Sequence, residues 1–277
     1  MLLETDLIPY HISHPPGEKV LVLSPHPDDE TLGCGGTIRL LLKSKKHVKV
    51  VFLTSGDKAD PSNKLSRITY NENPPIPPLL KGGEGGLLNE SHITVYALLR
   101  EKEAVKALRI LGVSDYEFLR FPDRELDAYY ENALEGLLKI VKSYMSDTIY
   151  SPSMIELNPD HRTTAALSME LQRIIMQRGR VRERVMPIRL VFYEITTPLR
   201  PNILIDITPV YNKKKRAIKK YKSQLKLKDY LKHITALNSI RSLTVNGPRY
   251  VEAFWCLDKP LNEKDIAKWL SYQQANL

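Results

Sequence analysis

The chain has 277 residues, of which 42% are hydrophobic and 26% charged, a composition that suits one large α/β domain of an ordinary globular protein. No apolar run reaches the roughly 18 residues that would span a bilayer, and the N-terminus lacks the pattern of a secretion signal. The two cysteines, Cys34 and Cys256, lie far apart, which excludes a disulfide framework and a cysteine-rich metal site. We therefore expect a cytoplasmic protein.

Apolar, β-branched segments alternate with helical patterns along the chain. We predict strands at 19–24, 48–54, 117–121, 147–151, 189–195 and 203–208, and helices near 35–44, 98–111, 130–145 and 161–177. Strands separated by helices are typical of βαβ units. We therefore expect an α/β fold with a Rossmann-like, doubly wound and mostly parallel sheet that carries helices on both faces, and a single domain over residues 1–277.

One segment interrupts this alternation. Residues 72–89 contain four prolines and four glycines and show no period. Such a segment cannot bury a core, so we expect a mobile surface loop. Two interpretations stay open, namely an inert insertion, similar to a bacterial repeat element translated in frame, and an active-site lid after strand 48–54.

A basic block occupies residues 213–232, which hold ten Lys or Arg and one Asp and so carry as much net charge as the whole chain, +9. Such a block attracts phosphates, anionic membranes or nucleic acids. Its apolar residues Ala217, Ile218, Tyr221 and Leu225 fall at helical spacing. We favour an amphipathic helix with a solvated basic face, and peripheral contact with a membrane stays open.

The residues that directly follow the first predicted strand are the strongest candidates for a site. His26, Asp28, Asp29 and Glu30 are concentrated on one short loop that contains two prolines. In doubly wound sheets, ligands bind beyond the carboxyl ends of the strands. An acidic turn that caps the following helix explains one acid, such as Glu30, but not the whole set.

A second cluster, Asn158, Asp160 and His161, follows the predicted strand 147–151. Catalytic zinc commonly takes three nitrogen or oxygen ligands from the protein and leaves a fourth position for water. His26, Asp29 and His161 are suited to that set, and an aspartate next to Asp29 would then be free to act on the water.

The two motifs together resemble those of the PIG-L/LmbE family of metal-dependent N-acetylglucosamine de-N-acetylases. Residues 25–30 match the family's (A/P)HPDDE motif and residues 158–161 its HPDH-type motif. The segment from Arg100 to Glu103 is similar to an Arg-x-x-Glu helix of the family, and Phe121-Pro122-Asp123 to its FPDG stretch. Weaker matches continue to residue 254, so the resemblance covers most of the chain.

The resemblance implies a role for each matching residue. The metal ligands would be His26, Asp29 and His161, and Asp28 would be the general base. Asp160 would orient a ligand or a catalytic group. Arg100 would contact substrate hydroxyls, although a helical pair with Glu103 is an equal alternative.

Asn158 departs from the family pattern, which has histidine at this position. In the family that histidine is thought to stabilise the oxyanion and to assist proton transfer. An asparagine donates a hydrogen bond but supplies no proton near neutral pH. A metal-containing sugar-binding protein with weakened catalysis is therefore the alternative to an active enzyme.

We thus expect a hydrolase that removes the N-acetyl group from an N-acetylglucosamine-type conjugate and releases acetate. The expected cofactor is Zn²⁺, with Fe²⁺ also compatible with two histidines and an aspartate. The expected partner is a small-molecule or glycoconjugate amino sugar and no nucleic acid, and homo-oligomers stay open. A nucleotide site at Gly33, Gly35 and Gly36 is disfavoured, because the spacing is wrong and the preceding loop is acidic.

Overall fold

The computed structural model describes residues 9, 11–60, 62, 64–69, 93–179 and 188–274. The Pro/Gly-rich segment 72–89, for which a loop was predicted, lies outside these ranges.

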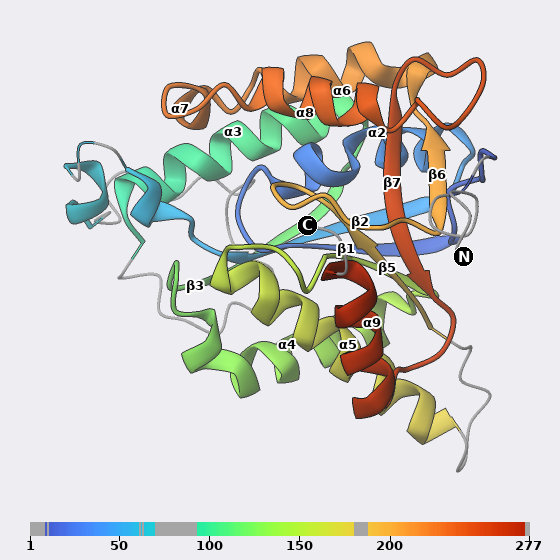
Figure 1. Ribbon diagram of the computed structural model, residues 1–277. Helices are drawn as coiled ribbons and strands as arrows, with labels where there is room; N and C mark the ends of the chain where they lie inside the picture. Colours follow the sequence, from blue (N-terminus) through green and yellow to red (C-terminus); the bar gives the residue numbers. More distant parts are fainter. Residues whose placement is uncertain are drawn as a thin grey trace.

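A seven-stranded sheet forms the centre of the molecule, in the order β3-β2-β1-β4-β5-β7-β6 (Figure 1). Six strands run parallel, and β7 runs antiparallel between β5 and β6. The strands are β1 (Lys19–Ser24), β2 (His47–Thr54), β3 (Asp115–Phe121), β4 (Thr148–Pro152), β5 (Arg189–Tyr193), β6 (Ile203–Asp206) and β7 (Val251–Leu257).

Helices cover both faces of this sheet (Figure 1). They are α2 (Asp29–Lys43), α3 (Val95–Leu111), α4 (Tyr130–Tyr144), α5 (Pro159–Gly179), α6 (Tyr211–Ile218), α7 (Lys222–Leu225), α8 (Tyr230–Ile240) and α9 (Glu263–Gln274), with short 3-10 turns at Asp57–Ala59, Leu65–Arg67, Leu126–Tyr129 and Thr208–Val210. One apolar core packs α2, α3 and α6 against the sheet, and a second packs α4, α5 and α9 against its other face. The predicted α/β fold is confirmed. Within the described ranges, no helix is long and apolar enough to cross a membrane.

Helix α2 begins at Asp29, six residues before the predicted start near residue 35, because the residues that precede this start are also helical. Its backbone is kinked at Cys34, which is fully buried. An added Cβ at Gly33 would lie 2.2 Å from the ring of Tyr193, and one at Gly36 would lie 2.6 Å from the side chain of Ile207. Close packing of the helix therefore requires glycine at these two positions.

Just after the kink in α2, a buried ion pair accepts hydrogen bonds from two backbone N–H groups of the helix. The carboxylate of Glu252 on β7 accepts hydrogen bonds from the backbone N–H groups of Gly36 (2.8 Å) and Thr37 (2.7 Å). Lys214 on α6 neutralises this carboxylate at 2.6 Å, and both side chains are fully buried. The C-terminal strand is thereby tied to the helix that carries the first acidic motif.

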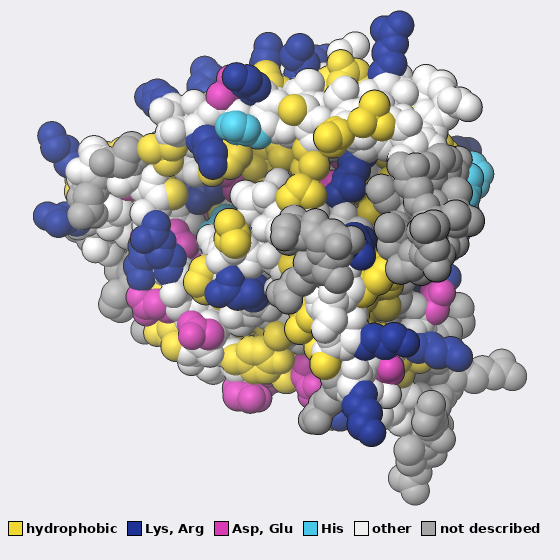
Figure 2. Space-filling model, in the orientation of Figure 1, with side chains coloured by type: hydrophobic (Ala, Val, Ile, Leu, Met, Phe, Trp, Pro, Cys, Tyr) yellow, Lys and Arg dark blue, Asp and Glu magenta, His cyan; other side chains and the backbone are white. Residues whose placement is uncertain are grey.

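The prediction of one amphipathic helix over 213–232 was wrong, because the block is divided among α6, α7 and α8. The chain leaves the helical path after Ile218 since Tyr221 turns inward to donate a hydrogen bond to Glu30. The predicted apolar side is correct for Ala217, Ile218 and Tyr221, which are buried. Most of the lysines lie in solvent, where Lys and Arg side chains gather along the upper edge of the molecule (Figure 2).

Candidate active site

The two motifs meet at the carboxyl ends of adjacent parallel strands. The first motif spans the connection from β1 to α2, and the second opens α5 after β4, which pairs directly with β1. Because the sheet continues to β2 and β3 on one side of β1 and to β4 and β5 on the other, this edge is a topological switch point. Ligands of open α/β sheets bind at such points.

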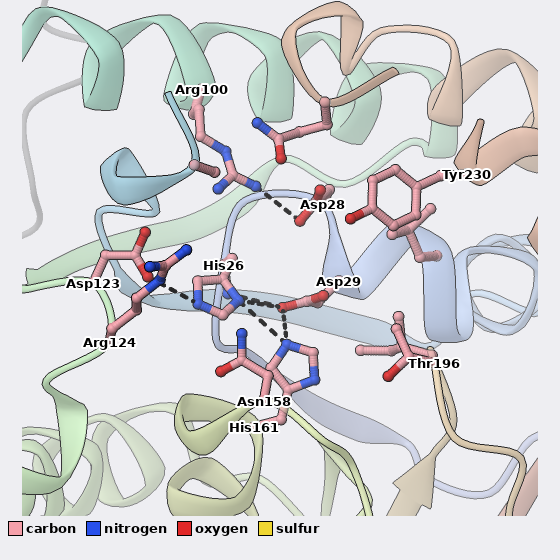
Figure 3. Close-up of a pocket in the computed structure, with 14 residues that line it drawn as sticks. His26, Asp28, Asp29, Arg100, Asp123, Arg124, Asn158, His161, Thr196 and Tyr230 are labelled. Atoms are coloured by element: carbon pink, nitrogen blue, oxygen red, sulfur yellow. Dashed lines mark hydrogen bonds and ion pairs between the residues drawn. The ribbon is translucent and has the colours of Figure 1, made fainter. Parts of the chain in front are cut away.

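Three buried side chains converge on one spot (Figure 3). The Nδ1 atom of His26 lies 3.0 Å from Oδ2 of Asp29, and Nε2 of His161 lies 3.1 Å from the same oxygen. The two ring nitrogens are 3.3 Å apart. Ligand atoms about 2.0–2.2 Å from a tetrahedral ion lie roughly 3.3–3.6 Å from one another. These three side chains, called the ligand triad below because they could hold a metal ion, therefore have nearly the spacing that a zinc-sized ion requires.

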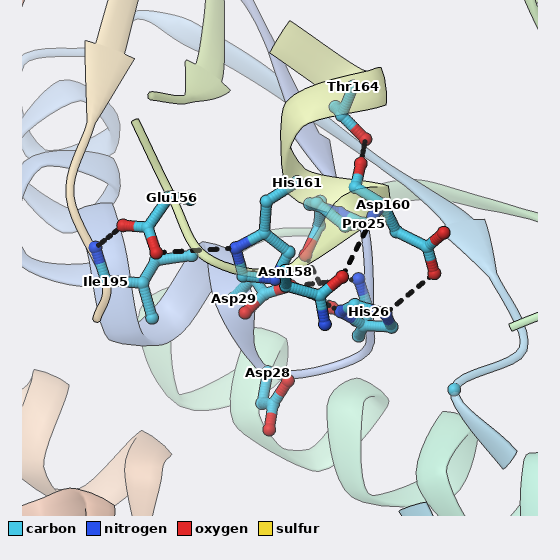
Figure 4. Close-up of polar contacts among 12 residues, drawn as sticks. Pro25, His26, Asp28, Asp29, Glu156, Asn158, Asp160, His161, Thr164 and Ile195 are labelled. Atoms are coloured by element: carbon cyan, nitrogen blue, oxygen red, sulfur yellow. Dashed lines mark hydrogen bonds and ion pairs between the residues drawn. The ribbon is translucent and has the colours of Figure 1, made fainter. Parts of the chain in front are cut away.

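The other nitrogen of His26 faces carboxylates. Its Nε2 atom lies 3.1 Å from Oδ2 of Asp160 and 3.3 Å from Oδ1 of Asp123. A hydrogen on Nε2 is therefore donated to a carboxylate, and the Nδ1 lone pair is left free for a metal ion. The Nδ1 atom of His161 likewise lies 3.7 Å from Oε2 of Glu156 (Figure 4).

The charges of the triad fit a cation at its centre. Burial would lower the pKa of His26, but hydrogen bonds with Asp123, Asp160 and Asp29 hold it well above its usual value. Burial would also lower the pKa of His161, but its contacts with Asp29 and Glu156 raise this pKa to about 9. The raised pKa values show that this spot favours a positive charge, and two nitrogens with one oxygen are a donor set that binds zinc.

Asp28 points away from the triad although it precedes Asp29 directly. Its φ of 152° is rare outside glycine, and this backbone conformation separates the directions of the two neighbouring side chains. The Oδ1 atom of Asp28 lies 3.0 Å from Nη2 of Arg100. Burial raises the pKa of Asp28 to about 7, against the opposing charge of Arg100. A carboxyl group in this state exchanges a proton near neutral pH.

Arg100 is buried and holds the first motif in place. Besides Asp28, its guanidinium donates to the carbonyl oxygens of Gly56 and Pro27, both at 2.7 Å. The alternative pair with Glu103 is wrong, because that carboxylate accepts from the backbone and hydroxyl of Ser223 instead. The side chain of Arg100 lines the pocket.

Asn158 forms the N-cap of α5. Its side-chain oxygen accepts a hydrogen bond from the backbone N–H of Asp160 at 2.9 Å (Figure 4). Because the oxygen is used in this way, the amide N–H₂ group is the part of Asn158 that is left for the pocket it lines. Asp160 in turn is fixed by the backbone N–H groups of Arg124 and Leu126.

These side chains surround one pocket of about 220 Å³. All three ligands of the triad line it, together with Asp28, Arg100 and Asn158. Glu30 lies outside this lining and is fully buried, where it accepts hydrogen bonds from Ser24 and Tyr221.

Several residues at the site were not predicted from the sequence. Asp123 was noted only as part of a matching stretch, although its proline-preceded position at a strand end could have singled it out. No sequence motif pointed to Glu156, since its partners are the backbone N–H groups of Ile195 and Thr196 on a distant loop. Other polar residues of the lining also come from segments that the motifs do not include, namely Arg124, Thr196, Gln224 and Tyr230.

Known proteins are similar to this chain in sequence and in fold. The model of the PIG-L family, described as GlcNAc-PI de-N-acetylase, matches residues 21–172, more than half of the chain. The diacetylchitobiose deacetylase of Thermococcus kodakarensis is 26% identical over 214 residues, which cover 75% of this chain and 70% of that protein. The probable N-acetyl-α-D-glucosaminyl L-malate deacetylase 2 of Bacillus cereus is 27% identical over 146 residues, or 51% and 55% of the two chains. The structure of N,N'-diacetylchitobiose deacetylase from Pyrococcus horikoshii has the same fold, with a TM-score of 0.66, 24% identity and coverage of 92% of this chain and 90% of that one.

Proposed function

The chain belongs to the PIG-L family of GlcNAc-PI de-N-acetylases, and we propose that it is a zinc-dependent enzyme that removes the acetyl group from an N-acetylglucosamine-type conjugate and releases acetate. The observation that carries this proposal is the different placement of two consecutive aspartates. Asp29 belongs to the ligand triad with His26 and His161, whereas Asp28 lies beside it in the pocket and joins no such group among the described residues.

We propose that His26, Asp29 and His161 hold the ion. Zinc suits two imidazoles and one carboxylate, and iron(II) is compatible with the same set. When bound, the ion would polarise the acetyl carbonyl and make water more acidic. Asp160 and Asp123 would keep the ring of His26 in the orientation and tautomer that metal binding needs.

Asp28 is the proposed general base. Its carboxylate removes a proton from water as the water oxygen attacks the acetyl carbon. The C–N bond then breaks, Asp28 returns the proton to the leaving nitrogen, and acetate and a free amino sugar result. Arg100 keeps Asp28 in the pocket through the contact between the two side chains, and its own contact with substrate hydroxyls remains a prediction.

Asn158 is the proposed donor to the negative oxygen of the tetrahedral intermediate. Its amide N–H₂ group is free for this because the amide oxygen caps α5. Such a donor stabilises negative charge but cannot protonate the leaving nitrogen, so both proton transfers fall to Asp28. We further propose a cytoplasmic enzyme that acts on small or conjugated amino sugars.

Acetate release from the methyl glycoside of N-acetylglucosamine tests the proposal. Protein stripped with a chelator should be inactive, and one equivalent of zinc should restore release. Asp28→Asn serves as the matched control, because it should bind the same equivalent of zinc and release acetate far more slowly. If zinc-loaded protein binds the glycoside but releases no acetate, the alternative of a sugar-binding protein is correct.

A further inference from the structure

We propose that Arg124 binds an oxyanion on the non-sugar part of the substrate and so gives the enzyme a preference for acidic conjugates. This role rests on the proposed function, because the proposed function places the N-acetylated sugar beside the ligand triad. Arg124 lines the pocket but takes no part in the chemistry described above.

The guanidinium of Arg124 has no ion-pair partner among the described residues. The other arginine of the pocket, Arg100, is engaged by Asp28 and by two carbonyl oxygens. The acid next to Arg124 in sequence, Glu125, pairs with Lys58 instead. Within the described part of the chain, the charge of this exposed arginine at the pocket is thus left without a counter-ion.

The backbone at Arg124 is held in a conformation that favours glycine. Its φ is +66°, at the third position of a turn closed by a hydrogen bond from Glu125 N–H to the oxygen of Pro122. Positive φ at this position is typical of type II turns, which prefer glycine there. Residues kept in such conformations concentrate at functional sites.

The same backbone is fixed relative to the ligand triad. The N–H of Arg124 donates to Oδ2 of Asp160 at 2.8 Å, and that oxygen also lies 3.1 Å from Nε2 of His26. Figure 3 shows Arg124 and Asp123 on one side of the triad, with Tyr230 and Thr196 on the opposite side. The backbone from which this cation extends is therefore fixed on one side of the reacting centre.

The chemistry of a guanidinium selects the ligand. An amino sugar carries neutral hydroxyl and amide groups near its acetyl group, and these do not require a cation. Carboxylates and phosphates match the planar fork of donors and form charge-assisted, bidentate hydrogen bonds. The group bound by Arg124 is therefore an oxyanion of the aglycone.

Three glycosides of N-acetylglucosamine test this role: the neutral methyl glycoside, the carboxymethyl glycoside and the methyl phosphodiester at the anomeric carbon. We expect the zinc-loaded enzyme to show kcat/KM on the order of tenfold higher for the acidic members than for the neutral one. In Arg124→Gly, which suits the turn, the ratio of acidic to neutral should fall to about one. Lys58→Ala removes one positive charge from the neighbouring segment and should keep the ratio. The two acidic members separate carboxylate from phosphate recognition.

A ratio of about one in the wild type, or a ratio that Arg124→Gly leaves unchanged, would overturn the role of Arg124. An equal loss of the ratio in Lys58→Ala would reduce it to general charge attraction and would also overturn it. If no glycoside releases acetate, the proposed function fails. Calorimetric binding of the same glycosides then decides on Arg124 alone, because equal affinities of wild type and Arg124→Gly for the acidic glycosides would refute the contact.

Discussion

Asp28 and Asp29 are neighbours in sequence, yet their substitution by asparagine should change stability in opposite directions. In the metal-free protein, burial raises the pKa of Asp28 from 3.8 to about 7, so the fold disfavours its charge. His161 and His26 hold the pKa of Asp29 below its usual range in spite of burial, so the fold favours that charge. A neutral amide should therefore stabilise the fold at position 28 and destabilise it at position 29.

The size of the effect follows from these contacts. The rise in the pKa of Asp28 from 3.8 to about 7 means that ionising its carboxyl destabilises the folded protein by up to about 4 kcal/mol. Asn at position 28 removes this cost and still offers an oxygen to Arg100. At position 29, asparagine leaves two buried imidazoles without their shared carboxylate, and breaking a buried pair costs about 3–5 kcal/mol.

The pH dependence gives the sign of the first effect. The folded protein binds more protons at Asp28 than the unfolded chain between pH 3.8 and about 7, so wild-type stability is lost as pH rises through this window. The gain from Asp28→Asn should thus be smaller at pH 5 than at pH 8.

Urea unfolding of the chelator-treated wild type and both variants at pH 5, 7 and 8 measures these differences. At pH 8 we expect Asp28→Asn to be more stable than the wild type and Asp29→Asn less stable. A destabilised Asp28→Asn at pH 8, or a difference from wild type that does not grow with pH, would refute the account of how this loop divides its two charges.

Three further predictions concern other parts of the protein. Lys214→Met should lower the free energy of unfolding by about 3–5 kcal/mol, because Glu252 is left charged and buried; urea unfolding checks this, and an unchanged midpoint would contradict it. Asn158→His should lower the free energy of unfolding by about 1 kcal/mol, because the helix cap is lost. The same variant should add an ionisation to the pH profile of kcat/KM. Superimposable profiles would show that no titrating acid is needed at this position. Zinc affinity should strengthen as pH rises toward about 9, since His161 must lose a proton to bind; affinity that is flat from pH 6 to 9 would count against His161 as a ligand.

The sequence predicts the parallel part of the sheet well, because strands covered on both faces are continuous apolar runs. The predicted strands at 19–24 and 48–54 differ from β1 and β2 by at most one residue. Strand β7 was not predicted, since its buried Glu252 interrupts the apolar pattern and only the distant partners Lys214 and Gly36 explain why a charge is there.

The site shows the same limit. The sequence places His26, Asp29 and His161 at neighbouring strand ends because each stands directly after a recognisable strand or opens a helix. Glu156 is invisible to such reasoning, because its role depends on a loop about forty residues away in the chain. The break of the basic block at Tyr221 likewise depends on a tertiary contact, the hydrogen bond to Glu30.

Anomalous diffraction at the zinc edge from a crystal of the zinc-loaded protein tests the central claim most directly. Among the residues that the structure describes, two groups of side chains could hold an ion: the triad of His26, Asp29 and His161, and the group of His26, Asp123 and Asp160. The account predicts one peak, about 2.0–2.2 Å from His26 Nδ1, Asp29 Oδ2 and His161 Nε2, with Asp28 outside coordination distance. A peak at the second group, or a zinc ion bound by Asp28, would contradict it.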